Sequence, residues 1–294
     1  MATPSNNVIR EYHRDASFKE RFNIYNDVTE YQLCLAYASD SGDGNFTSKW
    51  DTQNVSPFLI KEFKENCAAA NVPVKVFVSI GGDDPFKVDG ADDWIANATN
   101  SLKNMIKEYH IDGIDVNYTT IEGNNDMFVN CIKNLIKGLK EALGTTGFVA
   151  SLAPDAATNE GFYLPLYHAI DKTWIETVVF ECSVDVQPQD TNNPVASLVT
   201  QVQKIVQQYN PKDTKVLLGF SATKDGWNKV SPPVVGMVHK KKTIGMVHKK
   251  KKSGGRRFGS IVGGFFRELL EEVVADLITD MLTDVIIPLA ISSA

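Results

Sequence analysis

The sequence of 294 residues predicts an α/β fold built around a parallel sheet, on three observations. Short apolar runs alternate with longer segments of helical periodicity, which is the pattern of repeated β-α units. The run 74–80 is almost continuously apolar, as is typical of a strand that is covered on both faces. The hydrophobic fraction of 43% is ordinary for a globular protein and is sufficient for a large core.

Strands are expected at regular intervals along the first 231 residues. The segment 112–119 is the central one, because it reads D-G-I-D-V-N-Y-T and lies between two segments of helical pattern. The predicted strands are 8–11, 31–38, 74–80, 112–119, 148–153, 177–182 and 215–220.

Helices are expected between most of these strands. Ser56 is suited to cap the first helix, and Pro57 is suited to its first helical position. The predicted helices are 57–70, 92–109, 126–142, 163–170 and 194–208. Seven strands that alternate with helices predict a (β/α)8 TIM barrel that is truncated or irregular at its eighth unit.

The composition changes near residue 232. Residues 232–294 contain 10 basic and 6 acidic residues, a net charge of +4, which leaves 20 basic and 30 acidic residues, a net charge of −10, in 1–231. We therefore predict a barrel domain at 1–231, a basic low-complexity linker at 232–257, and an amphipathic helix with a short apolar end at 258–294. The tail is atypical of such a barrel.

The basic linker contains a tandem repeat of nine residues, V-V-G-M-V-H-K-K-K followed by T-I-G-M-V-H-K-K-K. A run of this charge is usually solvated, and the alternative is a patch that touches anionic surfaces such as lipid or nucleic acid. The later segment 285–291 could fill the missing eighth strand, although Pro288 opposes this, and the tail could also be a fused or misread gene segment. Acidic residues between its apolar pairs argue against a transmembrane span.

Several classes of protein are disfavoured by composition. The acidic body offers no nucleic-acid footprint to the barrel. The cysteines are scattered without metal-ligand spacing, so we expect them to be reduced and expect neither a metal nor a cofactor. These cysteines are Cys34, Cys67, Cys131 and Cys182. The first ten residues contain no apolar run of signal-peptide type, so we expect an intracellular, cytoplasmic protein.

The central strand places polar groups in an apolar setting. Asp115, Asn117 and Thr119 share one face, because side chains alternate along a strand. They form either a satisfied polar layer inside the barrel or part of a site at its mouth, where the carboxyl ends of the strands meet. The candidate ligand-binding residues are Tyr37, Ser79, Gly81, Gly82, Asp115, Asn117, Glu181 and Ser221.

The central strand resembles the D-x-x-D-x-D-x-E signature of family 18 glycoside hydrolases, the chitinase family. Its four key positions fall on Asp112, Asp115, Asn117 and Thr119. Supporting segments are V-I-R-E-Y at 8–12, V-F-V-S-I-G-G at 76–82 and K-V-L-L-G-F-S at 215–221. The resemblance covers residues 7–231 and is greatest to a non-enzymatic legume branch of this family, that of narbonin and the RuBisCO-associated protein.

The resemblance implies a degenerate motif with no intact catalytic set. The general acid of the family, a glutamate, falls on Thr119, and the aspartate that steadies the acetamido group of the substrate falls on Asn117. We expect a catalytically inactive plant barrel with a role in seed storage or in binding a carbohydrate or protein partner. The alternative is a weakly active glycoside hydrolase that acts on N-acetylglucosamine polymers through a displaced carboxylate, Glu122 or Glu181.

Overall fold

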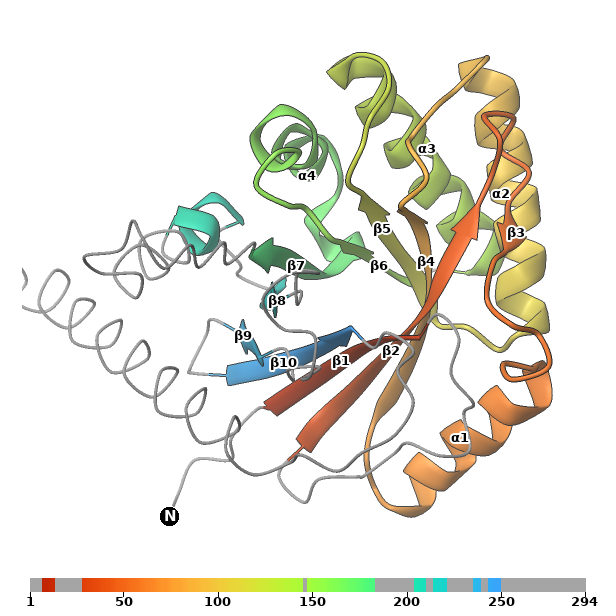
Figure 1. Cartoon of the computed structure of the whole chain (residues 1–294), viewed down its shortest axis with the longest axis vertical. Helices are drawn as coiled ribbons and strands as arrows, with labels where there is room; N and C mark the ends of the chain where they lie inside the picture. Colours follow the sequence, from red (N-terminus) through yellow and green to blue (C-terminus); the bar gives the residue numbers. More distant parts are fainter. Residues whose placement is uncertain are drawn as a thin grey trace, which may run out of the picture.

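A computed structural model describes residues 7–13, 28–144, 147–182, 204–209, 214–220, 235–238 and 243–249. Its strands form one sheet with the order β8-β7-β6-β5-β4-β2-β1-β10-β9, which curves into an irregular barrel (Figure 1). The first seven strands of this path pair in parallel with their neighbours. These strands are β1 (Asn7–His13), β2 (Val28–Ser39), β4 (Val74–Gly82), β5 (Gly113–Tyr118), β6 (Val149–Leu152), β7 (Ile175–Cys182) and β8 (Lys215–Phe220).

All seven strands predicted from the sequence are therefore confirmed, and so is the α/β barrel class. A two-residue strand, β3 (Thr47–Ser48), pairs antiparallel with the end of β2 and was not predicted. The seven strands of this path all run in the same direction. The carboxyl ends of these strands consequently meet at one end of the barrel.

The helices of the first half cover the outside of the sheet (Figure 1). They are α1 (Pro57–Ala69), α2 (Ala91–Glu108), α3 (Asn125–Leu143) and α4 (Leu164–Ala169). Ser56 caps α1 as predicted, because its hydroxyl oxygen accepts a hydrogen bond from the Leu59 backbone N–H at 3.3 Å. A π-helical turn, Asn159–Tyr163, leads into α4, and a short 3-10 turn, Lys172–Trp174, precedes β7. Residues 204–209 are helical, and the remainder of the predicted helix 194–208 lies outside the described residues.

The core has two layers, which the sheet separates. The larger layer packs the outer face of the strands against the helices, and Phe86, Trp94 and Phe128 are among its buried side chains. The smaller layer fills the inside of the barrel and includes Val8, Tyr12, Cys34, Tyr37, Phe77, Val179 and Leu217. Polar side chains that enter the barrel interior are therefore surrounded by apolar groups and need partners within the protein.

Two further strands lie in the segment that was predicted to be a solvated linker. They are β9 (Val235–Val238) and β10 (Thr243–Lys249), and they come from the two copies of the tandem repeat. β10 pairs in parallel with β1 and antiparallel with β9. The sequence did not predict these two strands, and each contains a short run of apolar or small residues that suffices for pairing despite the flanking lysines.

β10 also occupies the place beside β1 that the sequence assigned to residues 285–291. β8 contacts both β9 and β10, so the two ends of the sheet approach each other. The segment 285–291 and the predicted helix 258–283 lie outside the described residues, and the domain boundaries at 231 and 257 stay predictions. Within the described part of the chain, no helix has the length and hydrophobicity that a membrane span requires.

Candidate functional site

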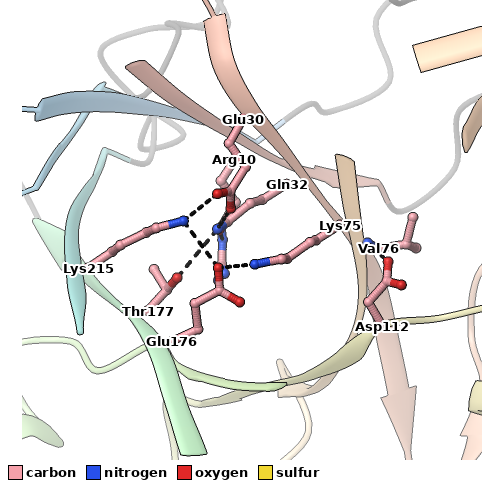
Figure 2. Close-up of polar contacts among 9 residues, drawn as sticks. All are labelled: Arg10, Glu30, Gln32, Lys75, Val76, Asp112, Glu176, Thr177 and Lys215. Carbon is pink, nitrogen blue, oxygen red and sulfur yellow. Dashed lines mark hydrogen bonds and ion pairs between the residues drawn. The ribbon is translucent and has the colours of Figure 1, made fainter. Parts of the chain in front are cut away.

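The four positions of the signature motif do not lie together. Asp112 comes just before β5, at the amino end of that strand, and Thr119 comes just after it. The Asp112 carboxylate accepts hydrogen bonds from Lys64 Nζ of α1 at 2.7 Å and from the Val76 N–H of β4 at 2.8 Å. In Figure 2, Asp112 and Val76 lie apart from the polar groups of the barrel interior. Asp112 therefore joins α1 and β4 to β5 and does not contribute to the mouth of the barrel.

Asp115 lies inside the barrel and is 0% exposed. Its Oδ1 accepts hydrogen bonds from Arg10 Nη1 at 2.8 Å and from Ser151 Oγ at 2.6 Å. Its Oδ2 accepts a hydrogen bond from Ser79 Oγ at 2.9 Å. Both carboxylate oxygens are thus engaged by side chains from β1, β4 and β6. For Asp115 this arrangement agrees with a satisfied polar layer, one of the two interpretations of the sequence, whereas the Nη2 atom of Arg10 has no hydrogen-bond partner among the residues that the structure describes.

Arg10 is the cation at the centre of this layer and is also 0% exposed. Its Nε donates a hydrogen bond to Gln32 Oε1 at 2.8 Å, and its guanidinium carbon lies 4.7 Å from the centre of the Phe77 ring. Burial alone would lower the pKa of Arg10, but neighbouring groups that include Asp115 outweigh it and raise the pKa above its ordinary value. Burial also raises the pKa of the nearby Cys34 thiol, which is therefore neutral. The pair of Arg10 and Asp115 is the charged centre of the layer.

The mouth of the barrel depends on the glycine pair at the end of β4. Gly81 and Gly82 have φ angles of +99° and +73°, which favour glycine. A Cβ on Gly81 would lie 2.7 Å from the Asn117 carbonyl oxygen, and a Cβ on Gly82 would lie 2.4 Å from the Tyr37 ring. The two glycines therefore let β4 pack closely against the strand ends that bear Tyr37 and Asn117.

The Thr119 side chain also contacts the backbone of the glycine pair. Its Oγ1 donates a hydrogen bond to the Gly82 carbonyl oxygen at 2.9 Å. The hydroxyl at the position of the family's general acid is thus bound to the main chain of the neighbouring strand. It has no carboxyl group with which to hold a transferable proton near neutral pH.

The structure brings most of the described candidates together in two groups. Ser79 and Asp115 belong to the interior layer, whereas Tyr37, Gly81, Gly82, Asn117 and Thr119 lie at the strand ends above it. Ser79 and Asn117 are buried as fully as Asp115, and Tyr37 is also buried. Glu181 lies in β7 opposite Gly219 of β8, its side chain being outside the description, and Ser221 lies outside the described residues. The described residues contain no group of three or more His, Cys, Asp or Glu side chains that could hold a metal ion.

A second polar cluster, not predicted from the sequence, crosses the interior near the amino ends of the strands (Figure 2). Lys215 Nζ pairs with Glu30 Oε2 and, at 3.1 Å, with Glu176 Oε1, and Lys75 also pairs with Glu176. Gln32 Nε2 donates to Glu30 Oε1 at 2.6 Å, which connects this cluster to Arg10. The available signal was a charged side chain in the first three residues of β2, β4, β7 and β8.

Opposite charges in this second cluster favour the ionised forms of Glu30 and Lys215. Burial alone would raise the pKa of Glu30, but the charges of Lys215 and Lys75 outweigh it and lower the pKa below its ordinary value. Burial alone would lower the pKa of Lys215, but Glu30 and Glu176 outweigh it and raise the pKa. Glu30 and Lys215 therefore remain ionised at neutral pH, and with Glu176 and Lys75 they form a chain of three ion pairs across the barrel.

The sequence of this chain is similar to a known protein family and to two characterised plant proteins. The sequence profile of the family described as "Glycosyl hydrolases family 18" matches residues 12–260. A RuBisCO-associated protein of Glycine max is 38% identical over 240 residues, which cover 77% of this chain and 82% of that protein. Chitinase 1 of Tulipa saxatilis subsp. bakeri is 35% identical over 187 residues, which cover 56% of this chain and 57% of that protein.

Solved structures agree with these sequence matches. The catalytic domain of a family GH18 chitinase from the fern Peteris ryukyuensis superimposes with a TM-score of 0.60 and 27% identity. The superposition covers 73% of this chain and 80% of the fern domain. The sequence match to residue 260 extends past residue 231, the predicted end of the resemblance, and it includes β9 and β10.

Proposed function

The chain belongs to glycosyl hydrolase family 18, and we propose that it is a member without hydrolytic activity that acts by associating with another protein. The observation on which this rests is the hydroxyl of Thr119 at the position of the general acid. In this family the substrate's own acetamido group assists the reaction, so the protein must supply one strong acid. A threonine hydroxyl does not release a proton in the range where such an acid works.

Among the residues that the structure describes, the surroundings of Thr119 offer no ready substitute for the acid. Glu122 is exposed in the loop after β5, where its N–H donates to the Phe86 carbonyl oxygen at 2.8 Å. Glu181 belongs to β7, which is separated from β5 by β6 in the sheet. Asp115, the remaining carboxylate of the motif inside the barrel, is bound by Arg10, Ser79 and Ser151.

Burial of the candidate sugar-binding side chains favours a protein partner over an oligosaccharide. Ser79, Asp115 and Asn117 are enclosed in the barrel, so a sugar would have to displace packed groups to reach them. The Glycine max relative is named for its association with RuBisCO, and its match extends over most of both chains. RuBisCO is therefore the first partner to test for this chain.

The absence of hydrolysis is tested with a fluorogenic chitobioside. We expect turnover no faster than in buffer for the wild type, for Glu122→Gln and for Glu181→Gln. Clear turnover by the wild type that disappears in either variant would show that a displaced carboxylate works as the acid. The first half of the proposal would then be wrong.

Association is tested by analytical ultracentrifugation of the purified chain with purified plant RuBisCO. We expect a complex that sediments faster than RuBisCO alone and that is lost when the chain is heat-unfolded first. Isothermal titration with chitin oligomers is the parallel measurement, and we expect no heat of binding. Oligomer binding without any RuBisCO complex would replace protein association with carbohydrate binding.

A further inference from the structure

The two copies of the nine-residue repeat form adjacent strands, and β10 is the one that pairs with β1. β10 contains residues of the second copy, whereas β9 contains residues of the first copy and pairs with β10 (Figure 1). We propose that the two copies are interchangeable, so that the first copy can replace the second beside β1 and the barrel has two alternative closures. We call the place beside β1 the closing position.

The residues that pair with β1 are the same in both copies. Residues 246–249 lie opposite residues 9–12 and read M-V-H-K. Residues 237–240, nine positions earlier, also read M-V-H-K. A slip of one residue would turn each side chain to the other face of the sheet, whereas a shift by nine returns every one of these residue types to its place. The free energy of pairing with β1 is therefore nearly equal for the two copies.

The copies differ only in their first two residues. The first copy begins with V-V and the second with T-I, and all four of these residues are β-branched. Such residues favour strands because their side chains pack well on a pleated surface. The differences therefore give neither copy a strong advantage in the closing position.

The hairpin of β9 and β10 does little to fix the choice between the copies. The two strands are joined by residues 239–242, which read H-K-K-K. This connection lacks the glycine, asparagine, aspartate or proline that favours a tight turn, and its three lysines repel one another. β9 pairs over only four residues, Val235–Val238, so the exchange gives up a short antiparallel pairing.

The chain before the repeat is long enough for either closure. β8 ends at Phe220, at the carboxyl end of the barrel, and a strand parallel to β1 must begin at the opposite end. For the first copy to take the closing position, residues 221–233 must span the length of a strand. These thirteen residues reach about 40 Å when extended, whereas the six residues of β8 span about 20 Å. The exchange therefore requires no change in β8 or β1.

The exchange shifts the rest of the chain by nine residues. With the second copy in the closing position, Lys250 is the first residue after the paired segment, and with the first copy it is Lys241. The part of the chain beyond the closing strand then becomes nine residues longer and includes the second copy. The repeat thus lets the barrel stay closed while the length of its tail changes.

Disulfide trapping in the full-length chain distinguishes the two closures. Ile9→Cys with Met246→Cys traps the closure that the structure shows, and Ile9→Cys with Met237→Cys traps the alternative. Met237 lies in β9, two strands from β1, which places it at least about 9.5 Å from Ile9. A disulfide tolerates a Cα separation of about 7 Å at most, so a bridge between positions 9 and 237 requires the exchange. We expect mass spectrometry of the oxidised, digested chain to detect both bridges.

A matched control separates the exchange from fluctuation of the hairpin. Val235 lies opposite Met246, so it is nearer to Ile9 than Met237 is. Fluctuation alone would bridge Ile9→Cys to Val235→Cys at least as fast as to Met237→Cys. The exchange instead places position 237 opposite position 9, so its bridge should form at least about 10-fold faster, because register brings the two Cα atoms within bonding reach. The proposal is wrong where no bridge forms to position 237, or where the bridge to position 235 forms as fast.

Proline substitutions give a second test that does not depend on disulfides. Val247→Pro disfavours the second copy in the closing position, and Val238→Pro disfavours the first, because proline lacks the N–H that a ladder uses. We expect Val247→Pro alone to lower the melting temperature by less than about 2 °C, because the first copy then closes the barrel, and the two prolines together to lower it by more than about 5 °C. Equal melting temperatures of Val247→Pro and the double variant would overturn the interchange.

Discussion

Lys215 of β8 forms an ion pair with Glu30 of β2 across the interior of the barrel, although 185 residues separate them along the chain. β8 and β2 are not neighbours in the sheet, so this contact crosses the barrel instead of following a strand pair. Glu176 and Lys75 extend it to β7 and β4. The cluster therefore ties four strands together at the amino end of the barrel.

Replacing Lys215 with methionine should destabilise the fold. The change leaves Glu30 and Glu176 facing each other with one lysine fewer, and an unpaired, half-buried carboxylate is costly. We expect the free energy of unfolding to fall by about 2 kcal/mol, measured by urea denaturation. Lys61→Met is the control, because its pair with Glu65 is exposed and should contribute less than about 0.5 kcal/mol. Equal losses in the two variants would contradict a structural role for the cluster.

The contribution of this cluster should depend on pH in a defined direction. Glu30 has a lowered pKa, so its stabilisation is present above the unfolded value, about 4.3, and is lost as the pH falls through the folded value. Lys215 has a raised pKa, so its stabilisation is present below the unfolded value, about 10.4, and is lost as the pH rises through the folded value. We expect the difference in unfolding free energy between wild type and Lys215→Met to be constant from about pH 6 to about pH 9, because both groups are charged there in the folded and the unfolded chain. The difference should shrink below about pH 4, and a difference that grows on acidification would refute this assignment.

Gly82→Ala should be more damaging than alanine at a glycine in open space. Its Cβ would lie 2.4 Å from the Tyr37 ring, and the φ angle of +73° adds strain. We expect a loss of about 3 kcal/mol in the free energy of unfolding. Gly123→Ala, with a φ angle of +115° and no atom within 4 Å of the new Cβ, should cost about 1 kcal/mol. Thermal unfolding followed by circular dichroism measures both, and similar losses would argue against close packing at Tyr37.

Truncation should reveal the contribution of β9 and β10. A chain that ends at residue 231 lacks both strands and leaves one edge of β1 without its parallel partner. A chain that ends at residue 260 keeps them and ends where the family match ends. We expect the shorter chain to melt more than about 5 °C below the longer one, because an exposed edge loses backbone hydrogen bonds and packing. Identical melting temperatures would mean that the barrel does not depend on these strands.

The sequence predicted the regular strands well because each one is a run of apolar residues between clear helical segments. Ser56 and Pro57 likewise predicted the start of α1, since a helix cap is a local feature. β9 and β10 were missed for the opposite reason. Each has only a few strand-forming residues beside a block of lysines, and the pairing of β10 with β1 brings together residues more than two hundred positions apart.

The polar interior was predicted only in part. The shared face of Asp115 and Asn117 follows from strand periodicity, but Arg10 comes from a strand that pairs with β2 and not with β5. Its contact with Asp115 exists because the sheet curls, which no local pattern encodes. The same holds for Lys215 and Glu30, whose pairing depends on curvature and not on neighbourhood in the sheet.

The position of Asp112 has a consequence for how sequence signatures are used to infer chemistry. Asp112 fixes α1 and β4 to β5, and Gly113 lies so close to β6 that a Cβ would meet the Val149 carbonyl oxygen at 2.1 Å. The first position of the signature, Asp112, thus has a structural role in joining the elements of the barrel. The last position, Thr119, is the one that determines whether the barrel has a catalytic acid. A protein that has lost its reaction can keep the first position for as long as it keeps its shape. Agreement at Asp112 is therefore evidence of architecture alone, and a search for enzymes in this family should give its decisive weight to the residue that stands at the end of the strand.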